Sequence, residues 1–67
     1  MKPKNRYFIL SIIHEWAASK NWLVEQVFWH GGEVVDVYAV DSSGASHLAE
    51  FDVDKTGMRA SLRKLRH

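Results

Sequence analysis

The chain has 67 residues, a formal net charge of +1 at pH 7 and no cysteine. This length suits one domain, which we expect to span residues 1–67 with frayed ends at 1–4 and 66–67. The absence of cysteine excludes disulfides and thiolate zinc sites, and it favours a cytoplasmic protein. A hydrophobic fraction of 46% argues against disorder. No apolar stretch approaches the ~20 residues of a membrane span, so we expect a soluble protein without membrane contact.

The first predicted element is a helix over residues 5–20. Its apolar residues recur at helical spacing and form one stripe, made of Phe8, Ile9, Ile12, Ile13 and Trp16. Asn5 is a suitable N-cap, because its side-chain oxygen can accept from a backbone N–H of the first turn. Asn21 suits the left-handed position that ends many helices. The stripe predicts that this helix packs on a sheet.

Three strands are predicted next, over residues 22–30, 33–41 and 45–53, because these stretches are rich in strand-forming residues and the last two alternate polar with apolar. The pair Gly31-Gly32 suits a two-residue turn between the first two strands. The sequence Ser42-Ser43-Gly44 suits a three-residue hairpin loop with glycine in a left-handed conformation. The strands should therefore form an antiparallel meander.

The loop lengths set a trial register for these strands. The two-residue turn places Phe28 opposite Val35, and the three-residue loop places Val35 opposite Phe51. The first helix is then expected to cover the face that holds Trp22, Val24, Phe28, Val35, Val37, Ala49, Phe51 and Val53. Gln26 falls on the same face, where a buried amide needs a partner. The expected core contains Ile9, Ile13, Trp16, Val35, Val37 and Phe51.

The tail, residues 58–67, fits two kinds of element. Met58, Leu62 and Leu65 share one face of a helix, whereas Met58, Ala60 and Leu62 equally share one face of a strand. We favour the helix. The predicted fold is thus α+β, in the order α-β-β-β-α: an N-terminal helix on a three-stranded antiparallel meander, followed by a short C-terminal helix.

The sequence contains no strong catalytic or metal-binding motif, so we expect no enzyme activity and no cofactor. Residues 52–57 resemble the start of a calcium loop, but Arg63 stands where calcium needs a bidentate carboxylate, and a strand followed by a turn explains them better. His14-Glu15 begins like a helical zinc-protease motif, but Ala18 replaces the second histidine. Asp36 and Glu50 lie opposite each other in the trial register. A catalytic carboxylate pair stays open there, although a solvated sheet face is the simpler account.

Charge is unevenly distributed along the chain. Every acid except Glu15 lies within residues 21–54, which contain no lysine or arginine. The tail is basic, and it supplies the candidate nucleic-acid-binding residues Lys55, Arg59, Arg63, Lys64 and Arg66. This layout suits either mutual neutralisation between tail and sheet or association between copies of the chain.

The sheet face turned away from the first helix is unusually apolar in the trial register. It holds the candidate protein-interface residues Leu23, Val27, Trp29, Val34, Tyr38, Val40 and Leu48. An apolar patch ringed by charge is typical of a protein contact, with Trp29 as its expected energetic centre. Alternatively, the C-terminal helix covers this face.

Two families have similar features. Val37 to Gly44 and Phe51 to Gly57 resemble the strand–D-x-x-G–strand hairpin and the D-x-x-T-G ending of a PepSY-type repeat, over roughly residues 33–58, with the ending compressed. That resemblance implies a non-enzymatic binding or inhibitory module. The order helix–three strands–helix also resembles the double-stranded-RNA-binding domain, in which a basic last helix contacts phosphates.

We therefore expect a small non-catalytic protein-interaction module that binds or inhibits its partner. That partner is another protein or a second copy of the chain, held through the outer sheet face. The alternative is a nucleic-acid-binding domain that uses the basic tail.

Overall fold

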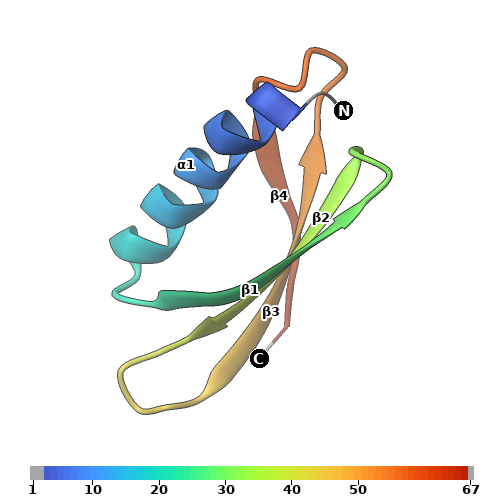
Figure 1. Ribbon diagram of the computed structural model, residues 1–67. Helices are drawn as coiled ribbons and strands as arrows, with labels where there is room; N and C mark the ends of the chain where they lie inside the picture. Colours follow the sequence, from blue (N-terminus) through green and yellow to red (C-terminus); the bar gives the residue numbers. More distant parts are fainter. Residues whose placement is uncertain (1–2, 67) are drawn as a thin grey trace.

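In the computed structural model, residues 3–66 form one helix and a four-stranded antiparallel sheet (Figure 1). The elements are α1 (Pro3–Ser19), β1 (Leu23–His30), β2 (Val34–Val40), β3 (Ser46–Val53) and β4 (Ala60–Arg66). The strands lie in the order β1-β2-β3-β4, so each strand pairs with the next along the chain. Residues 1–2 and 67, on which part of the expected fraying falls, lie outside the described residues.

The predicted α-β-β-β-α order is wrong because the tail is the strand β4, which pairs with β3. Leu62 lies opposite Phe51 and Leu65 lies opposite Ala49. The two leucines are three residues apart, whereas Phe51 and Ala49 are only two apart. The register shifts between these two pairs, which leaves Arg63 as the extra residue of a β-bulge. A bulged strand thus has the same leucine spacing as a helix. Pairing with β3 decides that the tail is a strand rather than a helix.

The helix α1 is longer at its start than expected and ends as predicted. It includes Pro3, whose fixed φ suits the first helical turn, so Asn5 lies within the helix rather than at its cap. Asn21 has a φ of 60°, and the backbone N–H of Trp22 donates to the Ala17 carbonyl over 2.9 Å. This is the Schellman arrangement, and the left-handed position predicted for Asn21 is confirmed.

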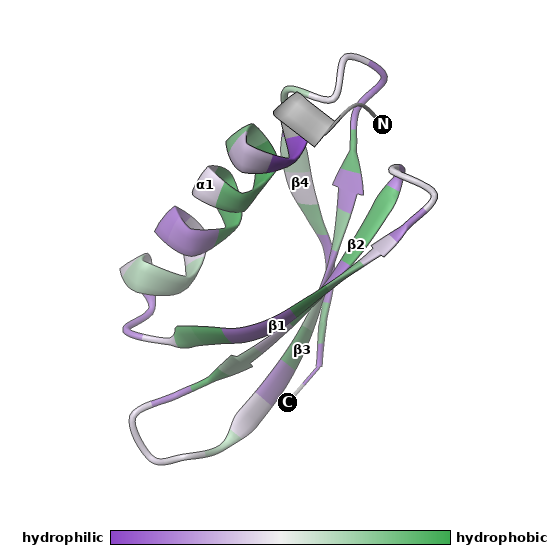
Figure 2. Cartoon of the chain, in the orientation of Figure 1, coloured by the Kyte–Doolittle hydropathy of each residue, from purple (hydrophilic) through white to green (hydrophobic). Residues whose placement is uncertain are grey.

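The apolar stripe of α1 covers one face of the sheet, and Figure 2 shows the hydrophobic side of the helix turned toward the strands. The fully or nearly fully buried residues of this layer are Ile9, Ile13, Ala17, Val35, Val37, Ala39, Ala49 and Phe51. The predicted core is therefore confirmed, with Trp16 half-buried at its margin.

The β2–β3 hairpin forms as the alternation predicts. Val35 lies opposite Phe51 and Asp36 lies opposite Glu50. Gly44 has a φ of 87°, which provides the expected left-handed glycine in the loop. The register between these two strands is confirmed throughout.

The register predicted for β1 and β2 is wrong by one residue near their shared loop. The loop has three residues rather than two: His30 pairs with Val34 and Trp29 pairs with Val35. Because side chains alternate between faces, this single residue turns Trp29 toward α1 and Phe28 away from it. A bulge at Glu25 then shifts the pairing back by one residue, so Leu23 lies opposite Val40, which is also its partner when the trial register is followed from Phe28 and Val35.

Candidate interaction surface

The face of the sheet opposite α1, here called the outer face, is not covered by any element of residues 3–66 (Figure 1). The predicted alternative, in which a C-terminal helix covers this face, is wrong because the tail is an edge strand of the same sheet. A layout like that of the double-stranded-RNA-binding domain is excluded for the same reason. The outer face is therefore the face of the sheet that is open to solvent.

Large apolar side chains gather on the outer face. The apolar patch consists of Leu23, Phe28, Tyr38, Val40 and Leu48, as strand alternation and register place them. Leu23 is 77% exposed and Phe28 is 47% exposed. The rings of Phe28 and Tyr38 meet edge-to-face, with centroids 5.7 Å apart. A sheet face open to solvent is usually polar, so this patch is the feature that needs an explanation.

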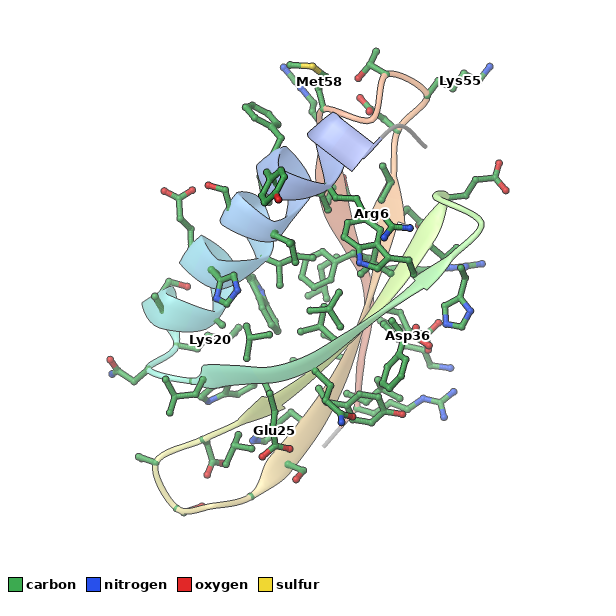
Figure 3. All side chains as sticks on the ribbon, viewed as in Figure 1. Arg6, Lys20, Glu25, Asp36, Lys55 and Met58 are labelled. Atoms are coloured by element: carbon green, nitrogen blue, oxygen red, sulfur yellow. The ribbon has the colours of Figure 1, made fainter. Side chains whose placement is uncertain are left out.

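The structure places five of the seven predicted interface residues on the outer face: Leu23, Val34, Tyr38, Val40 and Leu48. It contradicts the placement of Val27 and Trp29, which pack partly buried against the core on the helix side. There the Arg6 guanidinium lies 5.0 Å from the centre of a Trp29 ring, next to the label of Arg6 in Figure 3.

Phe28 takes the outward position predicted for Trp29, and the sequence held a signal for this exchange. The trial register buried Gln26 without a partner, whereas in the structure Gln26 is exposed. A polar residue on the wrong face indicates a register error of one residue.

Acidic and basic side chains lie side by side on the same outer face. The acidic strip is Asp36, Glu50 and Asp52 on β2 and β3, and the basic strip is Arg63, Lys64 and Arg66 on β4. Arg63 Nη1 lies 3.7 Å from Asp52 Oδ1, and Lys64 lies opposite Glu50. The mutual neutralisation of tail and sheet, one of the two predicted uses of the charge layout, therefore takes place within the sheet.

The predicted carboxylate pair of Asp36 and Glu50 exists, but basic groups flank both acids. His30 Nε2 donates to Asp36 Oδ2 over 2.9 Å near the label of Asp36 in Figure 3. Glu50 faces Lys64 across the strands. These contacts are those of a charged sheet face, and the two acids lie opposite each other as the trial register has it.

The five candidate nucleic-acid-binding residues divide into two groups. Lys55 and Arg59 are exposed in the β3–β4 loop, whereas Arg63, Lys64 and Arg66 belong to β4. Only the second group adjoins the acidic strip. Arg63, Lys64 and Arg66 therefore line one edge of the sheet, and Lys55 and Arg59 lie in the loop that leads to it.

An aromatic cluster on the inner side was not predicted. The buried ring of His47 stacks on Trp22 with centroids 4.1 Å apart and an interplanar angle of 1°. His47 Nε2 donates to Asp41 Oδ2 over 2.8 Å. The Ser43 hydroxyl, His47 and the Ala45 N–H all donate to Asp41 and hold the pKa of this carboxyl well below its usual range. Because Trp22 also meets the ring of Trp16, the cluster ties the β2–β3 loop to the end of α1.

The loop that resembled a calcium site is a turn, as predicted. Asp54 Oδ1 accepts from the Thr56 hydroxyl over 2.7 Å and from the Met58 N–H over 3.2 Å. Among the described side chains, no three histidine, aspartate or glutamate residues gather as a metal site would require. Within residues 3–66, no helix has the length and apolarity to cross a membrane.

Comparisons with protein-family models, with curated proteins and with solved structures give no significant match to this chain.

Proposed function

We propose that this chain is a small, non-catalytic, cytoplasmic module that binds another protein through the outer face of its sheet. The observation that supports this is the apolar patch, which lies exposed beside charged strips on an uncovered face. Apolar surface rimmed by charge is typical of protein contacts. The PepSY-like hairpin implies the same class, a binding or inhibitory module.

The aromatic side chains of the patch are Phe28 and Tyr38. Aromatic side chains dominate the binding energy of many interfaces because they bury a large rigid area. The edge-to-face contact of these two rings fixes their positions before binding, so little conformational entropy is lost on association.

The second candidate function is nucleic-acid binding through the basic residues of the β3–β4 loop and β4. The observation that favours it is the row of Arg63, Lys64 and Arg66 along one strand. The adjoining acidic strip opposes it, because phosphates would approach Glu50 and Asp52 together with the arginines.

Photo-crosslinking in cells separates these functions. A benzophenone amino acid replaces Phe28 in one variant, Lys64 in a second and His14, exposed on α1, in a control. The proposal expects protein adducts from position 28 and none from position 14. Nucleic-acid adducts from position 64, with no protein adduct from position 28, would establish the alternative and refute the proposal.

A further inference from the structure

The edges of the sheet are poorly suited to pairing with another chain. Both edge strands of the described sheet are bulged, β1 at Glu25 and β4 at Arg63, and the extra residue is charged in each case. A bulge and a charged side chain both disfavour edge-to-edge strand addition. Since α1 covers the inner face, the outer face is the surface of the sheet that stays open for association.

The charges of the outer face restrict what can cover it. A partner surface of one sign is attracted to one strip and repelled by the other, because the acidic and basic strips are adjacent. The partner must therefore present acidic and basic groups beside apolar side chains. A second copy of this chain meets this requirement, since both halves of a two-fold contact come from the same surface.

The register gives the geometry of such a contact. Tyr38 and Leu48 lie opposite each other near the middle of the apolar patch. Arg66 lies opposite Leu48 on the next strand, β4. At a strand spacing of ~4.8 Å, Arg66 is about 7 Å from the midpoint between Tyr38 and Leu48. Asp36 and Glu50 lie two residues along their strands, also about 7 Å away at ~3.4 Å per residue.

Arg66 lies as far from the midpoint of Tyr38 and Leu48 across the strands as Asp36 and Glu50 lie along them. These two equal distances at right angles favour one arrangement of two copies. We propose that two copies pack outer face to outer face with their strands nearly orthogonal, which is one of the two common ways for sheets to stack. Tyr38 and Leu48 then meet the same residues of the second copy. Arg66 of each copy lies over Asp36 and Glu50 of the other. This proposal rests on the proposed function and identifies the partner.

Four strands of seven or eight residues make a face of roughly 19 by 25 Å at standard spacings, or about 500 Å² per copy. A standard interface takes ~800 Å² per partner, so the dimer should be weak and concentration-dependent. Sedimentation velocity from micromolar to millimolar protein measures it. Arg66→Glu and Glu50→Arg each place like charges together and should weaken association by about tenfold or more. Glu15→Arg, on the exposed side of α1, is the control and should associate as the unaltered chain does.

The decisive measurement mixes the two weakened variants, Arg66→Glu and Glu50→Arg. In the mixed dimer the introduced glutamate of one variant faces the introduced arginine of the other, and the second contact is the natural one, so the mixture should associate again. Recovery in the mixture excludes misfolding as the cause of the losses. A mixture that stays monomeric, or single variants that associate normally, would overturn the proposal.

The two proposals can fail separately. An unaltered chain that stays monomeric at every concentration overturns self-association. Position 28 would then still give adducts with a different protein if the outer face is a binding surface. Absence of any protein adduct at position 28, together with a purified chain that stays monomeric at every concentration, would refute both.

Discussion

Trp29 and Phe28 are neighbours in β1 whose rings lie on opposite faces of the sheet. Trp29 packs against the buried core and lies under Arg6 from α1, whereas Phe28 meets Tyr38 on the outer face. The two aromatic residues therefore have separable roles. Trp29 joins the helix to the sheet, and Phe28 is available to a partner.

Replacing Trp29 by alanine should lower the free energy of unfolding by about 2 kcal/mol or more. The same change at a fully buried aromatic residue lowers it by ~3–5 kcal/mol, and Trp29 is partly buried. Phe28→Ala is the matched control, since it removes a neighbouring ring from the outer face. It should change stability by less than about 1 kcal/mol while weakening partner binding. Urea unfolding followed by circular dichroism measures both. Equal stabilities for the two variants would contradict the faces assigned to these residues.

The tail shows how an element can satisfy two sequence patterns. Leu62 and Leu65 face the inner side of β4 because the bulge at Arg63 adds one residue between them. The free edge of β3, with Phe51 and Ala49 beside it, provides backbone partners and an apolar surface that an isolated helix of this length would lack. Pairing with β3 therefore outweighs the helical spacing.

Ser61→Thr tests the conformation of the tail. Ser61 is exposed on β4 opposite Asp52, and threonine favours strands, so stability should rise by about 0.5 kcal/mol. A helical tail would instead lose stability or stay neutral. Ala18→Thr on the exposed side of α1 is the control, and there the same side chain should cost about 0.5 kcal/mol. Thermal melting of both variants shows whether each change raises or lowers the melting temperature.

The elements with one unambiguous pattern could be predicted from the sequence. The stripe of α1 and the alternation of β2 and β3 each fit a single period, and the core residues Ile9, Ile13, Val35 and Val37 followed from them. The β1 register could not be predicted from the glycines, since Gly31-Gly32 suits a two-residue turn and equally begins a three-residue loop. Of the five predicted interface residues that lie on the outer face, four belong to β2 and β3, whose register the alternation predicted. Leu23 is the fifth, because the Glu25 bulge restores its pairing with Val40.

Two aspartates hold the loops on either side of β3, and this affects the stability of the molecule as a whole. Asp41 accepts hydrogen bonds in the β2–β3 loop, and Asp54 does so in the β3–β4 loop. Donation by the Ser43 hydroxyl to Asp41 and by the Thr56 hydroxyl to Asp54 lowers the pKa of both carboxyls from 3.8. Because β3 is the strand between these loops, both carboxylates support the same central part of the sheet.

A lowered pKa in the folded state makes stability depend on pH in one direction. Near and below pH 3.8 the unfolded chain binds protons at these aspartates more readily than the folded chain does. Acid therefore favours unfolding, and the contribution of the two carboxylates is complete above the unfolded pKa and is lost as the pH falls through the folded one. Asparagine at either position does not titrate.

Asp41→Asn and Asp54→Asn should both be less stable than the unaltered chain at pH 7, and the difference should shrink as the pH falls from about 5 toward 2. This decrease of the stability difference with falling pH should be larger for Asp41→Asn, since the Asp41 carboxylate also accepts a hydrogen bond from His47. Urea unfolding at a series of pH values measures these differences, with Glu15→Gln on the exposed side of α1 as the control. A difference that stays constant across this range would show that neither carboxylate has a lowered pKa. A narrowing gap would show that acid weakens the sheet through the loops flanking β3.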